Sequence, residues 1–187
     1  MKIRNLLCFI PVVMAIALFT SAFIAKADDT NADIRSDLVA GQKAPPFHLK
    51  PINGKLVNFP DDYKGKIVML DFWATWCGPC CEELPNVVAA YQKYHDKGFD
   101  IVSVSLDAPQ QGPDLVQFMK DHGMTWPQIY DGGYWKAAVA VEYKVHAIPC
   151  PVVVDGDTGK ILAIGADAVG DDLPRVLEKA LAGKSGK

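Results

Sequence analysis

The hydrophobic and polar positions of the chain predict strands that alternate with helices. An apolar, β-branched run predicts a buried strand at residues 66–74, and apolar alternation predicts a second strand at 99–106. Apolar side chains at helical spacing predict the intervening helix from residue 80 to about 96. Further helices are expected at 114–122, 134–143 and 171–181, and further strands at 126–130, 152–155 and 160–165. This order of elements predicts an α/β protein with three layers.

A loop and a β-hairpin are predicted at residues 41–59, ahead of the first buried strand. Asn53-Gly54 is a strong signal for a two-residue turn, because both positions tolerate positive φ. The polar residues 28–40 have little to bury and are expected to form a flexible lead-in. We therefore expect one folded domain at residues 41–183, followed by a short tail at 184–187.

The first 27 residues have the pattern of an export segment. Lys2 and Arg4 precede an apolar run at residues 6–25, and Ala25-Lys26-Ala27 has the small-x-small form of a signal-peptidase site. The run is also long enough to cross a bilayer as an uncleaved anchor. Both alternatives place the rest of the chain outside the cytoplasm, in the periplasm or an equivalent compartment.

The charge balance argues against nucleic acid as a partner. The chain has 19 Lys and Arg and 22 Asp and Glu; three of the cations, Lys2, Arg4 and Lys26, lie before residue 28, and none of the acids does. The remainder therefore carries a formal net charge of −6. It contains no basic cluster of the kind that binds phosphate backbones.

The candidate chemistry lies at the end of the first buried strand, where Cys77 and Cys80 form a C-x-x-C pair. Cys77 is expected at a helix N-terminus, where unpaired N–H groups and the helix dipole stabilise a thiolate. The thiolate is the nucleophile of disulfide exchange. Cys80, one turn further on, is placed to attack a mixed disulfide formed by Cys77. A structural zinc site is the alternative, but it requires two more ligands, and the sequence has neither a second C-x-x-C nor a His-x-x-x-His pair.

The segment Phe-Trp-Ala-Thr-Trp-Cys-Gly-Pro-Cys at residues 72–80 resembles the active site of thioredoxin-like proteins. With Glu83 and Pro85 following, and Gly-x-x-Ala-Pro-x-Phe-x-Leu at residues 41–49, the chain is most similar to the TlpA/ResA branch of thiol–disulfide oxidoreductases. The resemblance implies a thioredoxin-like α/β/α sandwich with an N-terminal β-hairpin extension. It also implies a redox-active Cys77–Cys80 disulfide, protein thiols and disulfides as partners, and no dissociable cofactor.

Asp71 and Glu83 are candidate assistants of the cysteine pair. Asp71 interrupts an apolar strand, and burial there would raise the pKa of its carboxyl by desolvation. The position matches the buried aspartate of thioredoxins, which is implied to help proton transfer at the second cysteine; the ResA-like branch often has Asn. The alternative is a carboxylate at the strand end that faces water. Glu83 matches a glutamate of the TlpA-like motif close to the active site.

A second site segment is expected at residues 145–151, which resemble the proline loop that faces the cysteines in thioredoxin-like folds. By that resemblance the Ile148–Pro149 bond is cis, and a cis bond is uncommon even before proline. Ile148 and Pro149 would shape the substrate groove, with Trp76 beside it. Cys150 departs from the family pattern, in which Thr or Glu commonly follows the proline.

Three further side chains leave alternatives open. Cys81 and Cys150 could resolve, store or protect the main disulfide or form a second bond, or they could be an exposed idle thiol and a small buried one. His146 could join Cys77 and Cys81 in a soft-metal site, since thiolate and imidazole suit copper. We expect no resident metal, because the Trp-Cys-Gly-Pro-Cys segment favours redox chemistry.

The sequence thus predicts an exported thiol–disulfide oxidoreductase that reduces protein disulfides. Gly78-Pro79 is the dipeptide of thioredoxin, which is a reductant. A reductant in an oxidising compartment needs recharging, so a membrane electron donor of the DsbD or CcdA type is expected. Cytochrome c maturation, with apocytochrome c as substrate, is the pathway that the resemblance favours. The alternatives are a thiol peroxidase of the redoxin type, a Cu(I)-delivery protein and a general oxidase.

Overall fold

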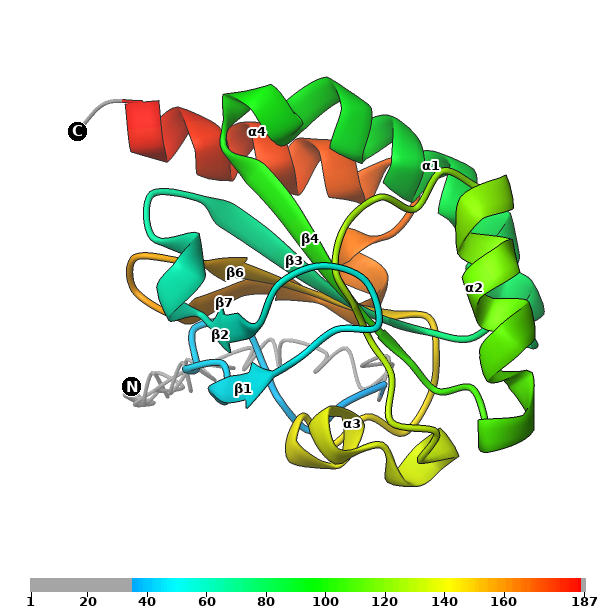
Figure 1. Ribbon diagram of the computed structural model, residues 1–187. Helices are drawn as coiled ribbons and strands as arrows, with labels where there is room; N and C mark the ends of the chain where they lie inside the picture. Colours follow the sequence, from blue (N-terminus) through cyan, green and yellow to red (C-terminus); the bar gives the residue numbers. More distant parts are fainter. Residues whose placement is uncertain (1–34, 186–187) are drawn as a thin grey trace, which may run out of the picture. The chain divides into compact units, whose positions relative to one another are not determined.

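The computed structural model describes residues 35–185, so the predicted signal or anchor at residues 1–27 lies outside the described part. A five-stranded mixed sheet in the order β5-β4-β3-β6-β7 forms the middle layer (Figure 1). Its strands are β3 (Ile67–Trp73), β4 (Phe99–Ser105), β5 (Gln128–Ile129), β6 (Cys150–Asp155) and β7 (Lys160–Ile164). The strands β3, β4 and β5 are parallel, whereas β6 runs antiparallel to both of its neighbours.

Helices cover both faces of this sheet, which confirms the predicted three layers. The helices α1 (Gly78–Tyr94) and α4 (Asp172–Ser185) lie on one face, and α3 (Ala138–Glu142) lies on the other (Figure 1). The helix α2 (Gly112–Asp121) packs Phe118 against Trp73, whereas the neighbouring Phe72 contacts Tyr143 beyond α3. Alternate residues of β3 thus serve opposite layers. Short 3₁₀ helices connect these elements at Asp61–Tyr63, His95–Lys97, Pro109–Gln111, Tyr134–Lys136 and Gly165–Ala168.

The central strand β3 is buried along its whole length, as its apolar run predicted. Val68, Met69, Leu70 and Phe72 have no exposed surface. Each such side chain contributes roughly 1.5–3 kcal/mol relative to an exposed one. The strand that carries the cysteines at its end is therefore held on both faces and both edges.

The predicted N-terminal hairpin is present as a two-stranded sheet of its own. Its strands β1 (Phe47–Leu49) and β2 (Val57–Phe59) pair in register, and the Phe47 and Phe59 rings stack at 5.1 Å. The prediction of a two-residue turn at Asn53-Gly54 was wrong, because the connection between the two strands spans residues 50–56. The Asn53 side chain bonds instead to the Trp126 carbonyl and the Gln128 N–H, and so ties this connection to β5.

Two helix predictions also require correction. The helix expected at 134–143 is divided into a 3₁₀ turn and the short α3, because the Asp131 carboxylate accepts N–H groups from Gly133 and from Ala138 and so caps two separate turns. The last helix was expected to end near Leu181, with a tail from residue 184. Instead α4 continues to Ser185.

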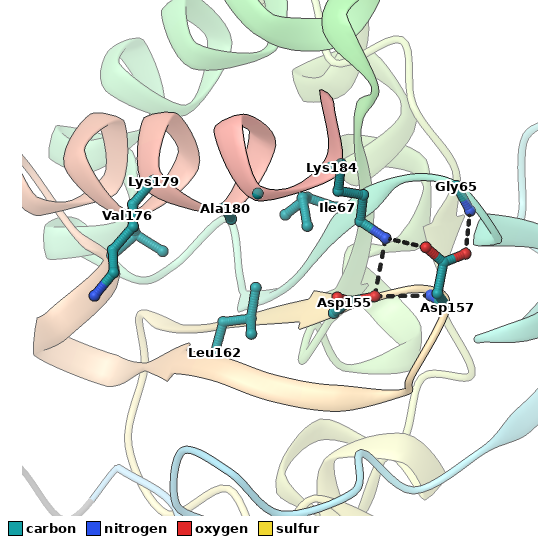
Figure 2. Close-up of a pocket in the computed structure, with 10 residues that line it drawn as sticks. Gly65, Ile67, Asp155, Asp157, Leu162, Val176, Lys179, Ala180 and Lys184 are labelled. Atoms are coloured by element: carbon teal, nitrogen blue, oxygen red, sulfur yellow. Dashed lines mark hydrogen bonds and ion pairs between the residues drawn. The ribbon is translucent and has the colours of Figure 1, made fainter. Parts of the chain in front are cut away.

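Lys184 accounts for the longer α4. Its ammonium group reaches Asp155, the last residue of β6, at 2.9 Å and Asp157, on the turn that follows, at 2.6 Å (Figure 2). Asp157 also accepts the Gly65 N–H at 2.6 Å (Figure 2). A cavity of about 490 Å³ lies beside this network. It lies at the start of β3, whereas the cysteine pair follows the strand's end.

The strand expected at 152–155 begins two residues earlier, at Cys150. Pro151 has no N–H for a strand ladder, but β7 pairs with β6 only from Val152 onward, so the proline is tolerated. Within residues 35–185, no helix combines the length and the apolar character that crossing a membrane requires.

Candidate active site

Cys77 and Cys80 are joined by a disulfide at the start of α1, as the resemblance implied. Their sulfur atoms are 2.08 Å apart and their Cα atoms 5.2 Å apart. Cys77 is the N-cap of the helix, and its sulfur accepts the Cys80 N–H at 3.2 Å. Pro79 occupies the first turn, where a missing N–H is tolerated. Once the disulfide is reduced, the same N–H group and the helix dipole would stabilise a Cys77 thiolate.

Asp71 lies inside the protein next to Cys80. Its side chain and Cys80 line one small cavity of about 10 Å³, together with Glu83 and Pro149. That volume is about the minimum that holds one water molecule. The pKa of Asp71 is raised to about 7. Burial is the largest cause; the charge of Glu83 also raises the pKa, and the hydrogen bond from Ser103 lowers it. The carboxyl group can therefore exchange a proton near neutral pH.

A short polar chain orients the group that contacts Asp71. The Ser103 hydroxyl donates to Asp71 at 3.3 Å. The indole N–H of Trp126 donates to the same hydroxyl at 2.8 Å. Because the hydroxyl oxygen accepts from Trp126, its own proton is directed towards Asp71. Both Ser103 and Trp126 are buried, and their part in the site had no signal in the sequence beyond polar residues in an apolar strand.

Glu83 forms another wall of the same cavity. Its carboxylate accepts the Gly170 N–H at 2.7 Å and the Asn86 side-chain amide at 3.1 Å. The Gly170 contact joins α1 to the turn that precedes α4, whereas Asn86 lies on α1 itself. Glu83 thus contributes a held negative charge near Asp71, and not a freely solvated one.

The Ile148–Pro149 bond is cis, as the resemblance implied, and Pro149 lines the cavity with Cys80. Arg35, which lies within the lead-in predicted at residues 28–40, donates to the Pro149 carbonyl at 2.8 Å. The Arg35 carbonyl accepts the His146 N–H at 2.7 Å, and Ser36 forms an antiparallel bridge with Val145. The chain around Arg35 therefore lies along the proline loop. No sequence motif indicated this role for Arg35.

Trp76 lies on the surface immediately before Cys77. It is 38% exposed, and its indole N–H donates to the Leu106 carbonyl at 3.3 Å. The rings of Tyr134 and Trp135 lie 5.2 Å and 5.9 Å from it, between ring centres. Three aromatic rings therefore gather on the Cys77 side of the disulfide.

Asp107 fixes the backbone just ahead of the cysteines. Its carboxylate has no exposed surface and accepts the Thr75 hydroxyl at 2.5 Å and the Thr75 N–H at 3.2 Å. It also accepts the Ser105 hydroxyl at 2.7 Å. In the sequence, Asp107 is only the residue that follows the predicted strand at 99–106. Aspartate is common in loops, so nothing in the pattern distinguished it.

The remaining candidate residues are dispersed around the site. Cys81 is partly exposed, and partial burial raises the pKa of its thiol, as do the carboxylates of Asp107 and Glu82. Cys150 is completely buried and lies opposite Phe72 in the sheet register.

His146 is exposed and lies 2.9 Å from the Asp37 carboxylate. In the described part of the chain, no three His, Cys, Asp or Glu side chains are grouped so that they could hold a metal ion, and so the proposed copper set is not assembled.

Comparisons with known proteins agree with this geometry. The model of the AhpC/TSA family matches residues 40–164. The ResA thiol-disulfide oxidoreductase of Bacillus thuringiensis subsp. konkukian is 32% identical over 139 residues, which cover 74% of this chain and 77% of that protein. The ResA protein of Oceanobacillus iheyensis is 36% identical over 142 residues, which cover 73% of this chain and 68% of that protein.

Solved structures give the same result. The thioredoxin domain of a thiol-disulfide oxidoreductase from Bacteroides vulgatus superposes with a TM-score of 0.66 at 30% identity, covering 77% of this chain and 99% of that one. A thiol:disulfide interchange protein from Bacteroides sp. superposes with a TM-score of 0.65 at 31% identity, covering 78% and 92%. The chain therefore belongs to the AhpC/TSA family and, within it, to the ResA-like thiol–disulfide oxidoreductases with a thioredoxin-like fold.

Proposed function

We propose that the protein reduces protein disulfides outside the cytoplasm, with Cys77 as the nucleophile and Cys80 as the resolving thiol. The observation that carries this proposal is the placement of Asp71. A carboxyl group with a pKa near 7 shares a cavity with Cys80, where the reaction must remove a proton. The ResA-like relatives support the reaction class.

The reaction begins from the reduced pair. The Cys77 thiolate attacks one sulfur of a substrate disulfide, so that a Cys77–substrate bond forms, the substrate S–S bond breaks and one substrate thiolate leaves. The helix N-terminus favours Cys77 over Cys80 as the attacking thiolate, because Cys77 is the N-cap. The departing thiolate takes a proton from water.

The second step releases the substrate. The Cys80 thiol passes its proton to the Asp71 carboxylate, through the small cavity that both line. The Cys80 sulfur then attacks Cys77, so that the Cys77–Cys80 bond forms and the second substrate thiolate leaves. Two electrons have moved from the protein to the substrate. Proton transfer to a group whose pKa lies near the working pH is efficient in both directions.

The surface around the disulfide supports binding of an extended polypeptide. Pro149 lines the cavity with Cys80, Ile148 immediately precedes it in the chain, and the half-exposed Trp76 immediately precedes Cys77. The Arg35 contact to the Pro149 carbonyl holds the loop against which a substrate strand would lie. Substrate selectivity would then come from side chains on either side of the attacked cysteine.

The sequence supports the direction and the compartment. Gly78-Pro79 matches thioredoxin, whose potential of about −270 mV makes it a reductant. The basic and apolar start of the chain supports export, with the domain either released or held at the inner membrane. A membrane dithiol donor of the DsbD or CcdA type would restore the reduced pair. Apocytochrome c, whose cysteines must be reduced before haem attachment, is the proposed substrate.

One structural observation favours this function over peroxide reduction. The AhpC/TSA family also suggests thiol peroxidases, whose active sites have a threonine three residues before the catalytic cysteine, whereas Thr75 stands only two residues before Cys77. Here the Thr75 hydroxyl donates to the buried Asp107 at 2.5 Å and is engaged away from the cysteine pair. A peroxide turnover assay separates the two functions, and the reductase proposal predicts turnover no faster than that of a free dithiol.

Trapping of the mixed disulfide tests the proposal directly. The Cys80→Ser variant should accumulate a covalent complex with a disulfide-containing substrate protein through Cys77, because the resolving thiol is absent. The Cys80→Ser/Cys81→Ser double variant is the matched control and should trap at least as much, since Cys81 is the nearby thiol that could replace Cys80. The Cys77→Ser variant should trap nothing. Trapping through Cys81, or none with any variant, would refute the assigned roles.

A further inference from the structure

We infer that the groove between Trp76, Tyr134 and residues 108–111 binds a basic side chain of the substrate, next to the cysteine that Cys77 attacks. This inference rests on the proposed function, since it names a feature of the substrate at the same site. The groove has a volume of about 560 Å³ and is lined by Trp76, Ala108, Gln110, Gln111 and Tyr134. Because Trp76 immediately precedes Cys77, a substrate held at the sulfur extends its neighbouring residues over this groove.

The aromatic wall of the groove is fixed in place. Trp76 is held by its hydrogen bond to Leu106, and its ring centre lies 5.2 Å from that of Tyr134. Tyr134 has a φ of 54°, a left-handed conformation that is strained for a residue with a side chain. Strained backbone of this kind is concentrated at functional sites. The strain here presents a tyrosine ring, 43% exposed, beside Trp76.

The opposite wall is also held by hydrogen bonds. The Gln111 side-chain oxygen accepts the Ala108 N–H at 2.8 Å, and the Tyr130 hydroxyl donates to the Ala108 carbonyl at 3.0 Å. Gln110 is exposed and lines the groove, and its side-chain amide carries an acceptor oxygen. The walls can therefore receive a side chain without reorganisation, which limits the entropic cost of binding.

The charges around the groove favour a cation. None of its lining residues is basic, and Lys136, two residues after Tyr134, is not among them. Burial raises the pKa of Tyr130, whose hydroxyl contacts the groove wall, and the carboxylates of Asp107 and Asp131 raise it further. Aromatic faces attract ammonium and guanidinium groups, and glutamine oxygens accept their protons. A lysine or arginine fits these features better than an apolar side chain, which would leave the acceptors unused.

Reduction of matched peptides tests this inference. Each peptide carries one disulfide and has Lys, Gln or Leu beside the attacked cysteine, scanned on both sides. We expect the reduced protein to react about two- to fivefold faster with the Lys peptide than with the Gln peptide, as for an exposed cation–π contact. In the Tyr134→Asn variant, in which asparagine tolerates the left-handed backbone, this ratio should fall towards one. Val141→Asn, at a residue that is 58% exposed on α3, is the control and should keep the ratio.

The outcomes separate this inference from the proposed function. Equal rates for Lys and Gln peptides, or fastest reduction of the Leu peptide, would overturn the cation subsite while leaving the reductase intact. A ratio that persists in Tyr134→Asn would also overturn it. If the wild-type dithiol reduces none of the peptides and no protein disulfide, the proposed function fails and the subsite fails with it.

Discussion

Two buried carboxyl groups, Asp107 and Asp71, lie close to the cysteine pair and differ in how many hydrogen bonds they accept. Asp107 accepts hydrogen bonds from the Thr75 N–H, the Thr75 hydroxyl and the Ser105 hydroxyl. On the Asp71 side chain, the hydrogen bond that we find within residues 35–185 is the 3.3 Å contact from Ser103. Burial raises the pKa of Asp71 to about 7. The carboxylate with many donors fixes a backbone segment, whereas the one with few donors can exchange a proton.

The difference shows how one fold obtains two roles from one residue type. A buried carboxylate is costly unless hydrogen bonds replace its water. Asp107 accepts such hydrogen bonds from Ser105 on β4 and from Thr75 on the turn before the cysteines. These bonds offset the free-energy cost of burying the carboxylate and hold the turn in place. Asp71 is poorly compensated, and the instability that results is the physical basis of its proposed proton chemistry.

The largest expected effect comes from removing the uncompensated carboxyl group. Folded Asp71 keeps its proton until about pH 7, whereas in the unfolded chain it loses the proton near its ordinary value of 3.8. The raised pKa therefore lowers the unfolding free energy as pH rises between these values, by up to about 4 kcal/mol, with no further change above. Asp71→Asn should be more stable than the wild type at pH 8, by roughly 2–4 kcal/mol, and nearly equal to it at pH 3.5.

Urea denaturation of the oxidised protein at both pH values measures this difference. The same variant should slow release of the substrate from Cys77, because the Cys80 proton has lost its acceptor. A variant that is equally or less stable than the wild type at pH 8 would mean that Asp71 is compensated in the same way as Asp107.

Replacing Asp107, whose carboxylate is well hydrogen-bonded, should lower the free energy of unfolding instead of raising it. In Asp107→Asn, an NH₂ group replaces one of the two carboxylate oxygens that accept from Thr75 and Ser105. An N–H group would then face a buried donor, and that donor would lose its acceptor. We expect the unfolding free energy to fall by about 2–3 kcal/mol at pH 8. Thr75→Val removes only the hydroxyl and should cost about 1 kcal/mol.

A double-mutant cycle between Thr75→Val and Asp107→Asn separates the contact from the rest of the site. The two changes should couple by at least about 0.5 kcal/mol, because they remove the same hydrogen bond. Strict additivity would show that the short Thr75 hydroxyl contact contributes nothing, and the positioning role of Asp107 would then rest on the Thr75 N–H and on Ser105.

The smallest effect distinguishes two serines on the same strand. The Ser103 hydroxyl donates to Asp71 and lowers its pKa, so Ser103→Ala should raise that pKa above 7, by up to about one pH unit. Ser105→Ala faces Asp107 and should leave the Asp71 titration unchanged. NMR titration of the Asp71 side-chain carbon measures both variants. Equal displacement of the Asp71 midpoint in the two variants would remove the distinction between the carboxylates.

The sequence predicted those parts of the fold whose causes are local. The apolar run of β3 and the helical spacing after Cys80 are set by residues close in the chain, and both elements are present. Asp71 could be identified because a single charge in an apolar strand is unusual. The Ile148–Pro149 loop was predicted through family resemblance, and the cis bond is present.

The remainder depended on contacts between distant residues. The last turn of α4 follows from the reach of Lys184 to Asp155 and Asp157, which no spacing reveals. Arg35 lies 114 residues before the carbonyl that it contacts, in a stretch whose polar composition predicted only a lead-in. Asp107 is an ordinary strand-ending residue in sequence, and its burial and three donor groups become evident only when β4 lies beside β3.

The most direct test of the central claim is the reduction potential of the Cys77–Cys80 pair. The full chain carrying Cys81→Ser would be equilibrated in dithiothreitol or glutathione buffers, and the oxidised fraction would be measured by alkylation of Cys77 and Cys80. A reductant predicts a value near that of thioredoxin, about −270 mV. A value near that of DsbA, about −120 mV, would contradict the reductase and make the protein an oxidant.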